Sequence, residues 1–318
     1  MSIYENLQPI NLEKINTYEL ASRPSKVTTA NFAAPVTEND SLKSFLEKLP
    51  DILAVKSLRE IAAQIRRAKS LEKPIVFGIG GHIVKTGLAP VLIDLMKRGF
   101  LTAIAANGSV LVHDCEIALV GFTSEDVDAS LGKGDFGAAR ETGEILNTAA
   151  KNGQQDRIGL GEAMGREVSR LNPAKPEVSL LYQTYQRKIP FTAHLAIGAD
   201  IGHFHPNSDG AALGETSHTD FKLFCSLVRE MNGGGAYLKL GSAVILPEIF
   251  LKAVTVVRNL RFPLEDFTTA NFDFIQSYRP NTNVVRRPVA NGAGRGFSLT
   301  GHHEILVPLL AAQIICGQ

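Results

Sequence analysis

A regular alternation of short apolar runs with longer helix-forming segments constrains the fold of this chain most strongly. The apolar runs end in glycine, serine or aspartate, and they occupy residues 74–81, 101–109, 191–200, 236–242 and 267–273. Runs of this kind are typical of strands that are buried on both faces of a sheet. Because helical segments separate them, the strands are joined by crossovers and lie parallel. The sequence predicts an α/β fold with a doubly wound, largely parallel, Rossmann-like sheet.

The expected helices fill the segments between these runs. Ser57 and Glu60 have the spacing of a capping box and predict a helix that ends at Lys69. Further helices are expected at 88–98, 114–120, 137–150, 159–187 with a break at 172–176, 219–231, 247–259 and 303–316. Residues 275–300 are expected to form an irregular loop. The polar start of the chain predicts an N-terminal arm (residues 1–40) ahead of a single nucleotide-binding domain (residues 41–318).

Charge and cysteine content narrow the class of protein. Lys and Arg total 33 against 32 Asp and Glu, a balance that argues against a nucleic-acid partner. No segment approaches the roughly 20 unbroken apolar residues that span a bilayer, and the N-terminus lacks a signal-peptide pattern. Cys115, Cys225 and Cys316 are few and far apart, as in reduced proteins. We expect a cytoplasmic protein that acts on a small molecule, with no nucleic-acid or membrane partner.

The segments that follow the predicted strands carry the candidate site, because ligands of doubly wound sheets bind beyond the carboxyl ends of the strands. Gly80 and Gly81 follow the first strand, although Ile83 stands where a dinucleotide fingerprint has its third glycine. These glycines favour either a close approach to a phosphate or a plain turn. His113, Asp114 and Glu116 follow the second strand. They are candidates for acid–base chemistry, or Asp114 caps a helix.

The loop after the third strand is rich in histidine. Asp200, His203 and His205 lie in it, and His218 follows. This set favours the polar lining of an organic-ligand pocket, with a divalent metal bound by His203, His205 and His218 as the alternative.

Basic residues and a cysteine complete the candidates. Lys85 and Lys239 flank the predicted pocket as imine-forming or anion-binding groups, but solvent exposure is the favoured interpretation. Cys225 is expected in the core. The late basic loop predicts an anion clamp or a solvated surface, formed by Arg279, Arg286, Arg287 and Arg295.

Taken in order, these segments resemble the deoxyhypusine synthase family. The resemblance is carried by KPIVFGIGGHIVKTGLAPVLIDLMKRGFLTAIAANGSVLVHDCEIAL, PFTAHLAIGADIGHFH, AYLKLGSAVILPEIFLKAVTVV and HEILVPLLAAQII. It implies a Rossmann-like NAD-binding fold, a homotetramer, and transfer of the butylamine part of spermidine to a protein lysine. The residues that it implies at the NAD site are Gly80, Gly81, Asn107, Gly108, Asp200, Gly241 and Ser242, with Asp114 or Glu116 as the acidic pair near the amine.

The chain departs from that family where the family forms its imine. The family's lysine lies in a Trp-Gly-Lys motif, but this chain has no tryptophan, and the matching stretch PVANGAGRGFSLTGHHE has no lysine. The family's acidic substrate-binding stretch is replaced by RPNTNVVRRPV, which is basic. A polycation needs anionic walls, so authentic deoxyhypusine synthesis is not expected.

The resulting expectation is an NAD-dependent transferase or oxidoreductase for a small amine or hydroxy substrate. His113 or His203 would act as acid and base, while Asp114, Glu116 and Asp200 orient substrate and ribose. The alternatives are a metal-dependent hydrolase that uses the histidine-rich loop, and a non-catalytic binding or assembly protein of the same fold.

Overall fold

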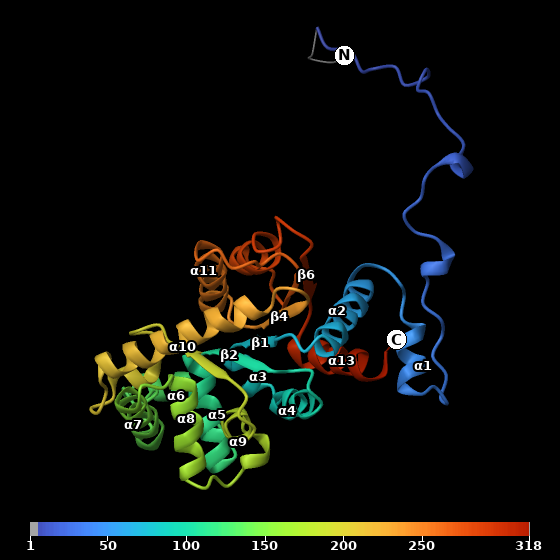
Figure 1. Ribbon diagram of the computed structural model, residues 1–318. Helices are drawn as coiled ribbons and strands as arrows, with labels where there is room; N and C mark the ends of the chain where they lie inside the picture. The colour runs from blue at the N-terminus through green and yellow to red at the C-terminus, as the bar shows by residue number, and fades with distance from the viewer. Residues whose placement is uncertain (1–5, 318) are drawn as a thin grey trace.

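The computed structural model, which describes residues 6–317, contains a six-stranded parallel sheet (Figure 1). The strands are β1 (Ile75–Ile79), β2 (Ala103–Asn107), β3 (Phe191–His194), β4 (Gly235–Leu240), β5 (Phe267–Asp273) and β6 (Arg295–Thr300). Their order is β3-β2-β1-β4-β5-β6, and every pairing is parallel. The predicted doubly wound, Rossmann-like α/β fold is therefore confirmed. The strand order reverses between β1 and β4, which is the switch point of the sheet.

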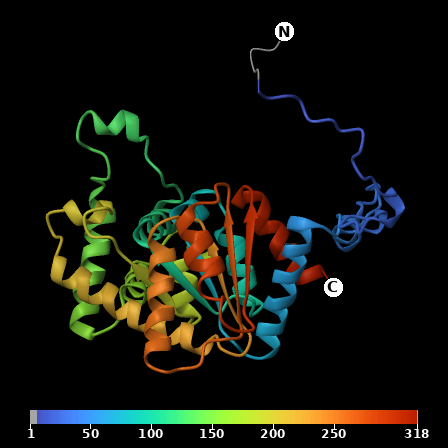
Figure 2. The ribbon, with the colours of Figure 1, turned by 90° about the horizontal axis from the view of Figure 1, so that it is seen from above.

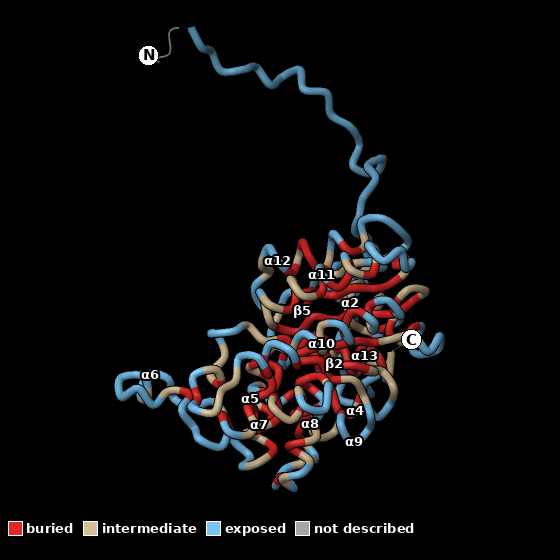
Figure 3. Tube along the Cα trace, turned by 60° about the vertical axis from the view of Figure 1, so that its left-hand side comes forward, coloured by how far each residue is buried: buried red, intermediate tan, exposed pale blue. Residues whose placement is uncertain are grey.

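Helices cover both faces of the sheet because its strands are apolar on both sides. Phe77 and Leu238 point to one hydrophobic cluster, whereas Val76 and Tyr237 point to the other. The first face is covered by α2 (Leu53–Ser70), α3 (Gly81–Lys85), α4 (Ala89–Lys97), α5 (Gly108–Val120) and α13 (His303–Cys316). The second face is covered by α10 (Gly210–Glu230) and α11 (Ile245–Asn259). The Cα trace coloured by burial shows the strands as the buried centre of the molecule (Figure 3).

Additional helices pack around α5 and β3, namely α7 (Arg140–Asp156), α8 (Leu160–Arg170) and α9 (Leu180–Gln186). Helix α6 (Val127–Leu131) has no buried residue and projects from the folded body (Figure 3). The break expected within 159–187 is confirmed, since only a 3-10 turn at Pro176–Val178 lies between α8 and α9.

Several predicted boundaries are wrong. Helix α2 begins at Leu53, so Ser57 lies inside the helix and does not cap it. Helix α5 begins at Gly108 directly after β2, and Asp114 therefore does not cap it. Helix α10 begins nine positions before Thr219, because the Asp209 carboxylate accepts hydrogen bonds from the nitrogens of Ala211 and Ala212.

Two segments near the sheet edges also differ from expectation. Strand β3 ends at His194, and the chain beyond it is a loop with a 3-10 turn at Ile201–Phe204. The segment 275–300 is not wholly irregular, because it contains the short helix α12 (Tyr278–Pro280), a π-helical turn at Asn281–Arg286 and the edge strand β6. Strand β6 has a single buried residue, so it lacks the apolar run that predicts a buried strand.

The described residues ahead of α1 (Leu42–Lys48), 6–41, form a segment that runs away from the folded body in both views (Figures 1 and 2). Its described part has only two 3-10 turns, at Leu20–Ser22 and Thr29–Asn31, and almost all of its side chains are exposed. Among residues 6–317, no helix is long and apolar enough to cross a membrane.

Candidate functional site

The turns after β1 and β4 meet at the switch point. Gly80 N donates to Leu240 O at 3.0 Å, which joins the ends of the two strands. A Cβ on Gly80 would lie 2.7 Å from the Ser242 nitrogen, so only glycine allows this approach. Gly241 and Ser242 both adopt positive φ values, of 73° and 57°. The β1 and β4 turns therefore form one tightly packed edge, as expected for a nucleotide-binding crevice.

The loop after β3 places Asp200 against the turn after β2, at the same edge of the sheet. Asn107 is the N-cap residue of α5, and its Oδ1 accepts a hydrogen bond from Ser109 Oγ at 2.8 Å. A Cβ on Gly108 would overlap the Asp200 carboxylate, so this side chain lies against the first turn of α5. Burial raises the pKa of Asp200 above its ordinary value. The loop after β3 thus supplies an acceptor next to the β2 turn.

The proposed NAD ligands are consequently placed along one edge of the sheet. The first turns of α3 and α5 contain no acidic side chain of their own, which leaves the ends of these helices compatible with an anion. Asp200 presents a carboxylate acceptor beside Gly108. The edge therefore combines the first turns of two helices with one acceptor, a set of groups that would fit a dinucleotide.

His113 and Glu116 belong to a hydrogen-bonded network at the β1–β2 side of this edge. His113 Nδ1 lies 2.8 Å from Thr123 Oγ1, and the Thr123 hydroxyl donates to Glu116. Thr142 Oγ1 donates to the other Glu116 oxygen at 2.9 Å. Burial, followed by the charge of Lys85, lowers the pKa of His113, while Glu116 raises it. A Cβ on Gly81 would lie 3.0 Å from His113 Cδ2, so the imidazole borders the β1 turn.

Asp114 points away from this network into the protein interior. Its oxygens accept hydrogen bonds from Ser179 Oγ at 2.6 Å, Leu180 N at 2.7 Å and Leu181 N at 2.9 Å. The carboxylate therefore caps α9 from within α5, and the side chain is fully buried. These contacts give Asp114 a structural role and leave it no free oxygen for a substrate.

The three histidines of the metal alternative have separate surroundings. His205 Nε2 contacts Gly137 O at 2.9 Å, and its ring fills the space beside Gly143. His203 Nδ1 accepts a hydrogen bond from Gly198 N at 3.0 Å, close to Asp200. The His218 ring stacks on Phe221. Within residues 6–317, no three His, Cys, Asp or Glu side chains are grouped to hold a metal.

Sequence reasoning missed a polar cluster at the β4–β5 end of the edge. Lys239 is fully buried, and its Nζ lies 2.8 Å from Asp273 Oδ2, so the expectation of a solvated lysine is wrong. His303 at the start of α13 is also buried, and its Nε2 lies 2.9 Å from Phe272 O. The sequence did indicate that Lys239 is buried, because this lysine lies within the apolar run AYLKLGS. A residue inside a strand that is covered on both faces has no route to solvent.

Three of the four late arginines make local contacts. Arg279 Nε lies 3.4 Å from Glu248 Oε1, and Arg287 donates to Asn283 Oδ1 at 2.9 Å. Arg295 lies 4.0 Å from Glu60 at the surface. Cys225 packs in the second hydrophobic cluster, as expected.

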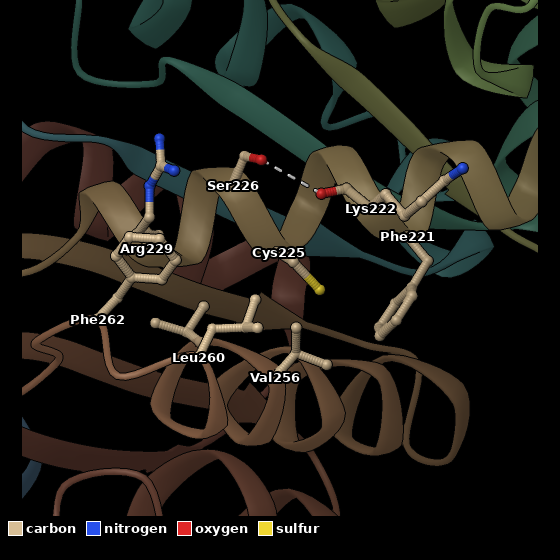
Figure 4. Close-up of a pocket in the computed structure, with 9 residues that line it drawn as sticks. Phe221, Lys222, Cys225, Ser226, Arg229, Val256, Leu260 and Phe262 are labelled. Atoms are coloured by element: carbon tan, nitrogen blue, oxygen red, sulfur yellow. Dashed lines mark hydrogen bonds between the residues drawn. The ribbon is translucent and has the colours of Figure 1, made fainter.

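A separate apolar groove lies between α10 and α11 (Figure 4). Phe221, Cys225, Leu260 and Phe262 contribute to its lining, and Arg229 lies over the Phe262 ring at 5.0 Å. The groove reaches the C-terminal end of α11, which comes just before the start of β5. The glycine turns, in contrast, follow the ends of β1 and β4. It therefore does not belong to the candidate site.

Comparisons with known proteins relate this chain to enzymes of the same fold. No family model matches it. It is 35% identical over 79 residues to an ornithine cyclodeaminase from Methanothermobacter thermautotrophicus, a match that covers 25% of this chain and 19% of the relative. The chain thus spans about a fifth of the length of that relative.

Two solved structures share the architecture. A protein assigned as a deoxyhypusine synthase from Entamoeba histolytica superposes with a TM-score of 0.53 at 10% identity, over 88% of this chain and 95% of the other. A complex of AgrE with ornithine and NAD+ gives a TM-score of 0.50 at 17% identity, over 81% of this chain and 32% of the other. At these identities the likeness establishes the fold alone. The resemblance to deoxyhypusine synthase is therefore supported as a likeness of fold.

Proposed function

We propose that this chain is an NAD-dependent enzyme for a small amine or hydroxy substrate and does not carry out deoxyhypusine synthesis. The observation that carries the proposal is the placement of Gly80, Gly108, Asp200 and Gly241 along the carboxyl edge of a β3-β2-β1-β4-β5-β6 sheet, beside its switch point. The AgrE complex with ornithine and NAD+ supports an amino acid as the amine, as does the ornithine cyclodeaminase relative.

The residues at this edge would have different roles in the proposed reaction. Gly80 and Gly81 would face the pyrophosphate, while Asp200 would accept a hydrogen bond from a ribose hydroxyl. A bound nicotinamide supplies hydride transfer, which leaves orientation and proton movement to the protein. His113 is suited to hold a proton in turn, because its lowered pKa keeps the imidazole neutral near pH 7 and Thr123 fixes its Nδ1. His203 remains a second candidate beside Asp200.

Replacing Gly108 by alanine tests the cofactor site. The new Cβ would displace the Asp200 carboxylate, which is the end of a side chain and can move without unfolding the protein. We expect NAD binding to weaken at least about tenfold, the loss of roughly one good hydrogen bond to a charged group. Isothermal titration calorimetry with NAD measures the change, and Asp200→Asn should have a similar effect.

Gly210→Ala provides the matched control. This glycine also lies in a helix, but a Cβ there would meet no atom within 4 Å, so NAD affinity should not change. NAD affinity that survives both Gly108→Ala and Asp200→Asn would remove Asp200 from the site. Failure of the unmodified protein to bind NAD would refute the proposed function itself.

We further propose a cytoplasmic homotetramer whose residues 41–318 form one nucleotide-binding domain. The exposed apolar side chains of the arm support contacts with another copy, since Leu7 is 73% and Ile10 is 83% exposed. Native mass spectrometry measures the mass of the assembly, and a monomer at micromolar concentration would contradict the tetramer.

A further inference from the structure

His303 has one nitrogen that is satisfied and one that is not. Its Nε2 lies 2.9 Å from Phe272 O, and because a carbonyl oxygen only accepts, Nε2 must carry the proton. In the neutral ring, Nδ1 is then a bare acceptor. The residue is only 1% exposed, and Nδ1 has no hydrogen-bond partner among the described residues. A buried acceptor without a donor costs about 1–3 kcal/mol, so such an atom calls for an explanation.

The ring borders the space between the β1 and β4 turns. His303 Cε1, the carbon between the two nitrogens, lies 3.8 Å from the point where a Cβ of Gly241 would stand. The same point is 3.7 Å from Gly80 N. On another side, the ring of the exposed His82 lies 5.5 Å away, centroid to centroid. His303 is therefore next to the two glycines at which the β1 and β4 turns meet at the switch point, and not in a remote part of the core.

We propose that His303 Nδ1 accepts a hydrogen bond from an N–H or O–H group of the molecule bound at the switch point. The site then selects ligands that present a donor there, either the amine or hydroxyl of the substrate or a donor group of the nucleotide. This inference rests on the proposed function for the presence of a ligand at that edge. It adds His303 to the candidate site, on the β4–β5 side and across the switch point from His113.

The charges around His303 favour the acceptor form. Burial is the largest influence and lowers the pKa of His303, as do the charges of His82 on α3 and Lys239 on β4. The Phe272 carbonyl and Asp273 on β5 raise it. His302 and Glu304 flank it on its own element, and they pair with each other at 3.7 Å. Near neutral pH the ring stays unprotonated on Nδ1, so this atom is free to accept.

Nitrogen NMR of the full chain labelled with 15N-histidine tests the proposal directly. The Nδ1 resonance of His303 is identified by its loss in His303→Gln, and it is then followed in three titrations: NAD+ alone, L-ornithine alone, and L-ornithine added to the NAD+ mixture. We expect Nδ1 to move upfield, as a bare imidazole nitrogen does when it accepts a hydrogen bond. A shift with NAD+ alone assigns the donor to the nucleotide, and a shift that needs ornithine assigns it to the substrate.

Absence of a shift in all three titrations would overturn the assignment, whether or not NAD+ binds. Calorimetry on the same samples reports NAD+ binding separately, so a failure of the proposed function is distinguishable from a failure of the His303 inference.

The variant His303→Gln gives a second readout. Glutamine places an amide nitrogen near the position of Nε2 and can still donate to Phe272 O, but it offers no acceptor at the position of Nδ1. We expect ligand affinity to fall about five- to tenfold, the loss of one net hydrogen bond. Lys97→Gln, at an exposed position on α4, is the control and should retain full affinity. Wild-type affinity in His303→Gln would show that the ring serves only the contact with Phe272.

Discussion

Replacing Lys239 by methionine is expected to lower the free energy of unfolding by about 3–5 kcal/mol, the usual effect of removing one member of a buried ion pair. The Lys239 side chain is 0% exposed and that of Asp273 is 8% exposed, with 2.8 Å between Nζ and Oδ2. Asp273 has one further bond, which its Oδ1 accepts from Phe274 N at 3.0 Å. Without Lys239, this carboxylate must remain buried and charged without its cation, or take up a proton. Either change weakens the folded state, and urea denaturation at pH 7 measures the loss.

The double variant Lys239→Met/Asp273→Asn separates the charge from the packing. Methionine approximates the length of the lysine stem, and asparagine removes the unpaired negative charge, so most of the lost stability should return. Lys252→Met is the matched surface control. Lys252 pairs with Glu248 at 3.1 Å, but the two side chains are 59% and 40% exposed, and an effect below about 1 kcal/mol is expected. A loss for Lys239→Met as small as that for Lys252→Met would contradict this account.

The parts of the fold that were predictable from sequence are those in which a local pattern and the tertiary structure agree. Strand β5 and helix α13 match their predicted bounds because an apolar run or a helical segment is bounded by clear breaks on both sides. Strand β6 was missed because an edge strand lacks the two-sided apolar signal. The start of α10 was missed although Asp209 is a standard N-cap residue, because the glycines and histidines around it favoured a longer loop.

Only the location of the candidate site, at the carboxyl edge of the sheet, was predictable from the sequence. The topology places the ends of parallel strands together, so glycines and acids that follow the strands are expected to converge. Which way a side chain points along a helix is decided by packing. Glu116 lies two positions after Asp114 on α5, yet Glu116 faces the His113 network whereas Asp114 faces α9. Sequence alone could not separate these two carboxylates, and it could not show that Lys239 and His303 are buried beside the switch point.

The buried carboxyl of Asp220 is expected to make the stability difference between the wild type and Asp220→Asn depend strongly on pH. Asp220 Oδ2 accepts hydrogen bonds from Gly161 N and Ala193 N, each at 2.8 Å, while Oδ1 has no partner among the described residues. Burial raises the pKa of Asp220 to about 7 in the folded protein, from about 4 in the unfolded chain. A carboxyl with one unpaired buried oxygen is better accommodated in its neutral form.

The sign of this pH dependence follows from proton linkage. Between pH 4 and pH 7 the folded state holds a proton that the unfolded state has released, so the contribution of Asp220 to stability falls as pH rises. Asparagine resembles the neutral acid and does not titrate. Asp220→Asn should therefore gain roughly 1 kcal/mol relative to wild type for each pH unit across this window. The comparison between variants is needed because His194, whose pKa burial lowers to about 3, gives the wild type an opposing slope over part of the same range.

Urea denaturation of both proteins at pH 4, 5, 6, 7 and 8 provides the measurement. Asp135→Asn, at an exposed loop position, is the matched control and should differ from wild type by an amount that changes little with pH. Since Asp114 is a second buried carboxyl, with its pKa raised by burial to about 6, its titration is present in both proteins and cancels in the difference. A difference between wild type and Asp220→Asn that stays constant from pH 4 to pH 8 would mean that Asp220 is ionised in the folded protein throughout. The hydrogen bonds from Gly161 and Ala193 would then outweigh the effect of burial on this carboxylate.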